Sequence, residues 1–215
     1  MPEYGGGSEM SGEYRIASYN LGGEEPGAAQ WDNIESIQLV DVITGKPPLL
    51  NTSVKMLTDS DTRAWWILFT GLDNGVVTKD EYKHDDPIYD CDVLELFYCD
   101  TGSLYEYKEL EVSPKNVTFD ASITYRKPFD FTGDTSWELE GWKTRASYDS
   151  ASIQSLWKIP LDSLGIAYMP GLVLPANLFR IDRGADSGHD EYTAWQPTGV
   201  LSFHLPDKFG RLIFM

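Results

Sequence analysis

The stretch Asp85–Phe97, DDPIYDCDVLELF, changes at Asp92 from turn-forming residues to a run of apolar and aromatic side chains. Asp and Pro favour loops, whereas Val, Leu and Phe fit a strand buried in a sheet. Because side chains alternate along a strand, Glu95 shares a face with Val93 and Phe97. The segment therefore predicts a loop followed by a strand that carries a carboxylate between apolar neighbours.

Other segments of this kind follow one another along the chain. Turn residues recur about every 8 to 12 positions, as in sandwiches and barrels, and no segment keeps a helical apolar period beyond a turn or two. Strands are expected at 14–21, 34–43, 53–59, 63–75, 93–99, 104–114, 116–125, 142–149, 152–160, 178–184 and 210–214, with a short helical turn at 160–165. The sequence therefore predicts an all-β fold, an antiparallel and jelly-roll-like β-sandwich.

Length and composition suit one large domain. The chain has 215 residues, of which 41% are hydrophobic and 13% aromatic, enough for a core and for rings that face a ligand. Residues 1–30 are rich in Gly, Glu and Ser, so we expect a partly flexible arm or linker, with 14–21 as an edge strand or a crossing arm. Residues 31–215 are expected to form a single β-sandwich domain.

The charge of the chain excludes some partners. Its formal net charge is −17, from 34 acidic and 17 basic residues, which repels phosphate backbones and anionic lipid surfaces. No run approaches the roughly 18 apolar residues of a membrane helix, and the first residues lack the pattern of a secretion signal. We expect neither nucleic acid nor a membrane as a partner.

The two cysteines are expected to be free thiols. Cys91 and Cys99 are eight residues apart on one expected strand, about 26 Å at the usual rise, which is too far for a disulfide. We expect both to be buried and structural, because the spacing gives no Cys-rich zinc site.

Two residues near the opening stretch have alternative roles. Glu95 either pairs with an interior arginine or accepts hydrogen bonds from ligand hydroxyls, because an unpaired buried charge is costly. The arginines that could pair with it are Arg145, Arg180 and Arg183. Tyr89 lies on the preceding loop, where its ring either covers the core edge or stacks on the C–H face of a sugar.

Five motifs occur in the order found in a known family. They are DDPIYDCDVLELF (85–97), YEYKELEVSP (105–114) with the following FDA (119–121), NLFR (177–180), AWQP (194–197) and FHLPDKFGRLIF (203–214). Together, over roughly Trp31 to Phe214, they resemble the family 9 carbohydrate-binding modules and their family-9-like relatives. The resemblance implies a β-sandwich that binds sugar without catalysis, holding the end of a glucan or xylan chain between two aromatic rings.

Position by position, the resemblance suggests a sugar site. It places Tyr89 and Phe203 where the two clamping tryptophans stand, and Glu95 where a glutamate binds hydroxyls. A ligand-binding arginine of the family falls on Glu111, and an asparagine falls on Val200. The resemblance therefore implies a site altered at Glu111, Val200 and Phe203.

Three further residues complete the expected ligand-binding set. His204 follows the second clamp directly. Trp195 either supplies a ring to the site or packs in the core. Arg180 either donates to a sugar or neutralises Glu95.

The resemblance also bears on metals, partners and location. Family 9 modules often carry structural calcium, and loop oxygens of the type that calcium takes occur at Asp59, Asp61, Asp73, Asn74, Asp85 and Asp86. No confident metal ligands emerge, and no catalytic residue is assigned. The expected partner is a xylan- or glucan-derived oligosaccharide, with an attached glycoside hydrolase such as an endoxylanase, in an extracellular or periplasmic setting.

Other functions stay open at this point. A sandwich that only mediates protein contacts fits the same strands. A glycoside hydrolase needs two carboxylates about 5 to 9.5 Å apart across a cleft, and among 34 acidic residues some pair will fit. Haem binding through His204 or Met56 is disfavoured, because the chain has three His and no CxxCH motif.

Overall fold

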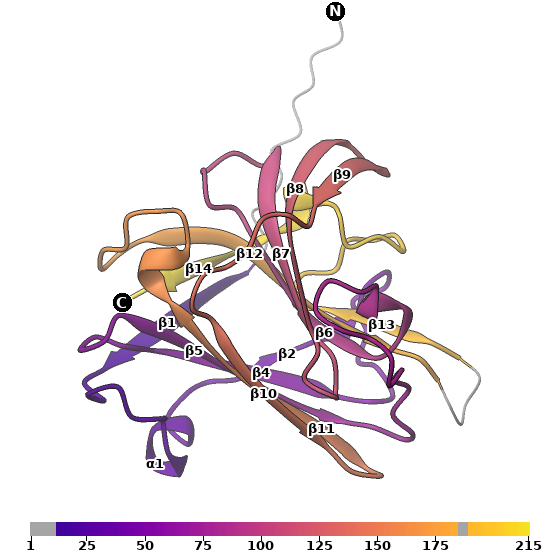
Figure 1. The fold of residues 1–215 in the computed structure, drawn as a ribbon, viewed down its shortest axis with the longest axis horizontal. Helices are drawn as coiled ribbons and strands as arrows, with labels where there is room; N and C mark the ends of the chain where they lie inside the picture. Colours follow the sequence, from indigo (N-terminus) through magenta and orange to yellow (C-terminus); the bar gives the residue numbers. More distant parts are fainter. Residues whose placement is uncertain (1–11, 185–188) are drawn as a thin grey trace, which may run out of the picture.

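The computed structural model describes residues 12–184 and 189–215, which form two packed β-sheets. The first sheet has the order β1 (Glu13–Tyr19), β14 (Gly210–Phe214), β12 (Val173–Asp182), β6 (Val93–Tyr98), β7 (Glu106–Val112), β8 (Thr118–Lys127), β9 (Asp130–Asp134), and β13 (Glu191–Ala194) joins β12 to β3 (Val40–Asp41). The second sheet runs β1, β4 (Thr52–Asp59), β5 (Ala64–Leu72), β11 (Ser152–Pro160), β10 (Lys143–Tyr148), with β2 (Ile37–Gln38) on β4. Figure 1 shows the two layers, with the β8–β9 hairpin projecting at the upper right.

The strand β1 connects the two sheets. Its first half, 13–16, pairs in parallel with β14 of the first sheet, and 17–19 pair in parallel with β4 of the second. Ile16 is fully buried between them. Residues 13–19 of the expected arm are thus a crossing strand inside the sandwich.

The main core lies between the sheets, and strand alternation decides which side chains enter it. On β6, Leu94 and Leu96 point into this core, where they join Trp65 and Trp157 from the second sheet. The alternate residues of β6 point to the outer face of the first sheet, where a second apolar cluster forms. That second cluster contains Val93, Phe97, Cys99, Tyr107, Phe119, Ala121, Ile123, Tyr125, Phe179, Ile181, Ala194, Phe203 and Phe209, among others.

The all-β sandwich expected from the sequence is confirmed. The expected helical turn is present as a 3-10 turn, Leu161–Ser163, and two more 3-10 turns are Ile88–Asp90 and Pro206–Lys208. The sequence patterns missed the short strands β9 and β13 and the one-turn helix α1 (Ala28–Trp31). These elements are short, and β9 is mostly exposed, so they lack the apolar alternation that marks the longer strands.

The prediction of free, buried thiols is confirmed, because Cys91 and Cys99 are both free and buried. Across the described part of the chain, no helix has the length and apolar character needed to cross a membrane.

Candidate functional site

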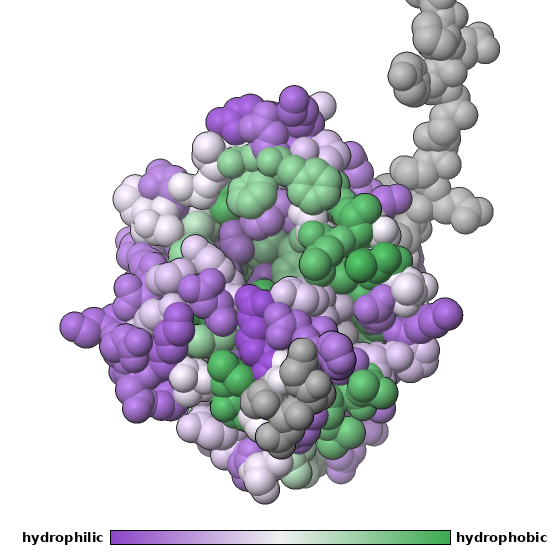
Figure 2. All heavy atoms as spheres, turned by 90° about the vertical axis from the view of Figure 1, so that its right-hand side faces the viewer, coloured by the Kyte–Doolittle hydropathy of each residue, from purple (hydrophilic) through white to green (hydrophobic). Residues whose placement is uncertain are grey.

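A cavity of about 720 Å³ opens on the outer face of the first sheet. Figure 2 shows the molecule from the right-hand side of Figure 1, where the surface is hollowed and hydrophobic side chains gather along the rim. The lining residues come from five strands of the sheet, from β13 and from three loops: Asp85, Pro87, Tyr89, Glu95, Glu109, Glu111, Phe119, Ile123, Phe131, Gly133, Thr135, Ile181, Tyr192, Leu201, Ser202, Phe203 and His204. A cavity of this size suits a small organic ligand.

Three glutamates on neighbouring strands form the floor of this cavity. Glu95 on β6 lies opposite Glu111 on β7, and Glu109 lies two residues from Glu111 on the same face. Their exposed fractions are 2%, 1% and 7%, respectively. One carboxylate oxygen from each lies within 4.8 Å of the others, so the three form one compact acidic group.

Three carboxylate oxygens of the glutamate floor have no hydrogen-bond partner among the described residues. Among the described residues, no group hydrogen-bonds to Oε1 of Glu95 or to either carboxylate oxygen of Glu111 in the geometry observed. Burial and mutual repulsion raise the pKa values of Glu95 and Glu111 well above the ordinary value. Burial raises the pKa of Glu109 to about 7, although its close contact with Glu111 lowers that pKa in part. The floor therefore attracts protons or another cation.

Aromatic rings form the walls. Tyr89 is 42% exposed and forms a T-shaped pair with Phe119, at 5.8 Å between centroids and 89° between planes, so part of its ring is open to the cavity. Phe203 stacks on Phe179 at 4.2 Å and 11°, so only its other face can meet a ligand. Phe131 on β9 adds a ring that the sequence patterns did not single out. Flat faces of this kind suit the C–H face of a sugar ring.

His204 is half-buried within these walls. Its ring stacks on Phe131 at 3.6 Å and 20°, and its Nδ1 shares a 2.7 Å hydrogen bond with the Tyr107 hydroxyl. Burial lowers the pKa of His204 to about 4. The imidazole is therefore neutral at physiological pH and adds no positive charge to the cavity.

We expect His204 and His84 to titrate on opposite sides of pH 6.5. Burial lowers the pKa of His84, but its hydrogen bond with Glu138 and the charges of Asp85 and Asp120 outweigh burial and raise it overall. An NMR titration of the imidazole nitrogens, with a His84→Gln variant for assignment, measures both rings. Titration of His204 at or above pH 6.5 would contradict its placement in a dry aromatic wall.

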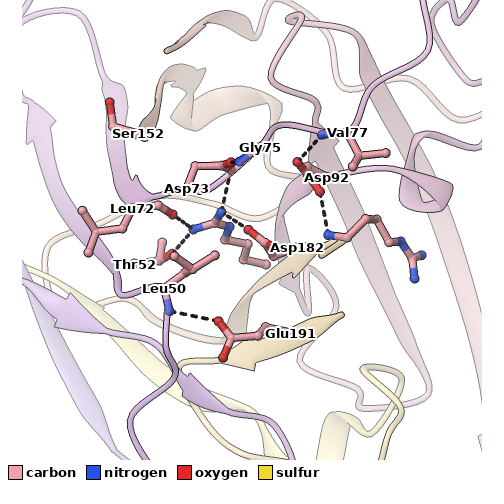
Figure 3. Close-up of polar contacts among 12 residues, drawn as sticks. Leu50, Thr52, Leu72, Asp73, Gly75, Val77, Asp92, Ser152, Asp182 and Glu191 are labelled. Carbon is pink, nitrogen blue, oxygen red and sulfur yellow. Dashed lines mark hydrogen bonds and ion pairs between the residues drawn. The ribbon is translucent and has the colours of Figure 1, made fainter. Parts of the chain in front are cut away.

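The structure places Arg180 away from the cavity, contrary to both roles expected from the sequence. Residue 180 pairs with Leu94 on β6, whereas Phe179 pairs with Glu95, so the Arg180 side chain points into the sandwich. There its guanidinium donates to the Thr52 hydroxyl at 3.0 Å and pairs with two aspartates (Figure 3). Those aspartates are Asp73, at 2.9 Å, and Asp182.

The other arginines offered as partners for Glu95 are also engaged elsewhere. Arg145 forms an exposed ion pair with Glu25 at 2.6 Å. Arg183 pairs with Asp190 at 2.8 Å and donates to the backbone carbonyl of Tyr89. Arg183 therefore positions the loop that carries Tyr89, and its charge only moderates the pKa of Glu95 from a distance.

Trp195 also lies outside the cavity lining. Its ring packs on the backbone of Gly210, where an added Cβ would come within 2.6 Å of the ring. The side chain is partly buried against the main core between the sheets. Of the two roles considered for Trp195, this geometry corresponds to core packing.

Two groups of side chains among the described residues lie close enough together to share a metal ion: His84 with Asp120 and Glu138, and the glutamate floor. Nε2 of His84 lies 3.0 Å from Glu138 and 3.4 Å from Asp120, while its Nδ1 contacts Thr118. Several of the loop aspartates considered for calcium also have protein partners. For example, Asp59 accepts hydrogen bonds from the backbone of Leu21, Gly23 and Asp61, and Asp73 pairs with Arg180 as described above.

The structure thus brings five of the seven expected site residues together, namely Tyr89, Glu95, Glu111, Phe203 and His204. Sequence reasoning missed Glu109, although the alternation that placed Glu95 also places Glu109 on the same face as Tyr107 and Glu111. It also missed Phe131, because the exposed strand β9 was not expected.

The comparisons with known proteins agree with this architecture. A crystal structure of a candidate carbohydrate-binding protein from Bacteroides uniformis superposes with a TM-score of 0.74 at 15% identity, over 94% of this chain and 99% of that one. A family 9 carbohydrate-binding module from Caldicellulosiruptor kristjanssonii in complex with glucose gives 0.67 at 13% identity, over 95% and 96%. The same kind of module with cellotriose gives 0.63 at 15%, over 94% and 93%.

Sequence comparison alone is less informative. No protein-family model matches the chain. A protein of Arthroderma benhamiae named as an extracellular protein is 26% identical over 188 residues, which cover 80% of this chain and 82% of that protein. The structural neighbours carry the assignment of architecture: the chain has the β-sandwich fold of the family 9 carbohydrate-binding modules.

Proposed function

We propose that this protein binds carbohydrate in the cavity on the outer face of the first sheet, without chemically changing it. The observation that carries the proposal is the combination of aromatic rings that line the cavity with buried carboxylate oxygens that have no hydrogen-bond partner among the described residues. Rings stack on the C–H faces of a sugar, and carboxylates accept hydrogen bonds from its polar groups. The complexes of structurally similar modules with glucose and cellotriose support this proposal.

We propose that the ligand of this cavity is the end of a short oligosaccharide, from a glucan, a xylan or a chemically related chain. The related Arthroderma protein supports an extracellular setting. In that setting, binding raises the local concentration of a hydrolase that is attached to the chain or acts with it on polysaccharide.

Replacing Tyr89 with alanine is expected to weaken sugar binding about 10- to 100-fold, because a stacked ring contributes about 1 to 3 kcal/mol. Isothermal calorimetry with a panel of soluble glycans measures the effect. Tyr105→Ala is the matched control, because Tyr105 is exposed and lies outside the lining of this cavity. Equal loss in both variants, or no loss in either, would remove Tyr89 from the site.

Phe203, which forms another part of the cavity wall, requires a more conservative substitution than alanine. Because Phe203 is buried on Phe179, alanine there would also leave a void in the second apolar cluster. Phe203→Leu keeps most of the volume and removes the flat face. We expect Phe203→Leu to weaken the binding of the same glycans that Tyr89→Ala affects, with a smaller change in affinity.

Hydrolysis is a second candidate function, because the cavity holds several carboxyl groups with raised pKa values. Glycosidases, however, place their two carboxyl groups on either side of the scissile bond. Here the three glutamates lie side by side on β6 and β7, beneath one side of any bound ligand. Turnover of aryl glycosides by the protein would favour hydrolysis over binding.

A further inference from the structure

The glutamate floor holds more buried acidic groups than a neutral sugar requires. Glu95, Glu109 and Glu111 are all nine-tenths buried or more, and their oxygens face one another within 4.8 Å. Three of these oxygens, Oε1 of Glu95 and both of Glu111, lack a hydrogen-bond partner among the described residues. Buried carboxylates are normally paired or hydrogen-bonded, because an isolated charge is costly to desolvate.

Among the residues that the structure describes, no lysine or arginine lines this cavity. The described lining residues include no lysine and no arginine, and His204 is neutral at physiological pH. Residues 1–11 and 185–188, outside the described ranges, contain no lysine or arginine either. Arg180 points to the opposite face of the sheet, and Arg183 is paired with Asp190. In the free protein, protons on the carboxyl groups reduce the charge of the floor, and any other positive charge that complements it has to come with the ligand.

The chemistry of the floor and walls favours a primary ammonium group over a metal ion. An ammonium has three N–H donors, which three neighbouring carboxylates can accept, and it can lie against aromatic faces. Calcium takes six to eight oxygen ligands, mostly from carboxylates and carbonyls, and beyond the three glutamates the described lining adds only one carboxylate, Asp85. A bare ion would also leave the aromatic walls and most of the 720 Å³ unused.

We propose, resting on the carbohydrate-binding function above, that the cavity is selective for amino sugars, with the protonated amine on Glu95, Glu109 and Glu111 and the ring against the aromatic walls. The ligand class is a glucosamine-type oligosaccharide with free amino groups. N-acetylation removes the positive charge and two N–H donors, and a hydroxyl at the same position has no charge. Both changes leave the carboxylates without a cationic partner.

The test compares three disaccharides that share ring shape and β-1,4 linkage and differ at carbon 2: glucosamine, N-acetylglucosamine and glucose disaccharides. In calorimetry on the wild-type protein at pH 7, we expect the glucosamine disaccharide to bind about 10- to 100-fold more tightly than the other two, as for a charge-assisted hydrogen bond replaced by a neutral one. Equal or tighter binding of the glucose disaccharide overturns the amino-sugar inference and leaves sugar binding intact. If none of the three binds, and the wider glycan panel is also blank, both proposals fail.

A variant distinguishes the effect of the glutamate floor on ligand preference from the effect of the protein's overall negative charge. With a net charge of −17, the whole surface attracts any cationic sugar. Glu111→Gln is expected to remove the preference for the glucosamine disaccharide, whereas Glu106→Gln, an exposed residue of the same strand, should retain it. Equal loss in both variants would assign the preference to surface charge and overturn the proposal.

The same titrations also distinguish an ammonium ligand on the floor from a metal ion. Amino-sugar binding through the ammonium should be unchanged by a chelator and weakened by added calcium that competes for the floor. Binding of the neutral disaccharide that requires calcium and disappears in Glu111→Gln would assign the floor to a metal ion and overturn the proposal.

Discussion

Replacing Arg180 with methionine is expected to lower the free energy of unfolding by about 3 to 5 kcal/mol. The Arg180 side chain is 1% exposed and pairs with Asp73 and Asp182, which are 5% and 4% exposed. Its guanidinium also donates to the carbonyl of Leu72 at 2.6 Å and to the hydroxyl of Thr52. Without the cation, two buried carboxylates remain without a counter-charge, and that desolvation penalty dominates the loss.

Urea denaturation at pH 7 measures this loss, and two further variants identify its cause. The triple variant Arg180→Met, Asp73→Asn, Asp182→Asn removes all three charges and should recover much of the stability. If it is as unstable as the single variant, lost packing rather than unpaired charge is responsible. Arg145→Met is the control, because its ion pair with Glu25 is exposed and such pairs contribute less than about 1 kcal/mol.

The position of Arg180 also shows where sequence reasoning was insufficient. Alternation in NLFR separates Asn177 and Phe179 from Arg180, but it does not say which face carries the cavity. That depends on the register with β6, where Phe179 lies opposite Glu95. Register is a long-range property of strand pairing, and a shift of one residue would reverse the faces. Both sequence-based roles for Arg180 assumed the wrong face.

The sequence pattern alone predicted the side-chain directions correctly where a strand is buried and its residues alternate between the two faces. The segment Val93–Tyr98 is buried throughout, and its alternation correctly separates Leu94 and Leu96 from Phe97. The loop position of Tyr89 and the closing run with Phe203 also fall at the cavity. Phe131 could not be anticipated, because its stacking on His204 joins two segments that are distant in sequence.

Replacing Glu109 with glutamine is expected to make the protein more stable above pH 7, by about 3 kcal/mol, and to have little effect near pH 4. Burial raises the pKa of Glu109 from 4.5 to about 7. Between these two values the folded state retains a proton that the unfolded state releases, so stability falls as pH rises and the penalty is complete above pH 7. A shift of this size corresponds to about 3 kcal/mol, and glutamine has no such penalty.

The difference between variant and wild type, measured by urea denaturation at each pH, isolates this effect. Shifted groups away from the floor are present in both proteins and cancel to first order, including His204, whose lowered pKa acts in the opposite direction between pH 4 and 6.5. Glu95 and Glu111 contribute in the same direction as Glu109, because the substitution removes a neighbouring charge that raises their pKa values. Glu106→Gln, on the exposed part of the same strand, should leave the unfolding free energy unchanged across this range. A loss of stability in Glu109→Gln at pH 8 would mean that protein donors already satisfy the floor.

The same substitution links stability to ligand choice. A floor of three buried carboxyl groups destabilises the free protein at neutral pH, and a bound cation removes that penalty by compensating the charge. We therefore expect the glucosamine disaccharide to raise the melting temperature of the wild type more than that of Glu109→Gln. A variant that is more stable alone, yet gains less from the amino sugar, is the result expected if the carboxylates serve ligand recognition rather than folding.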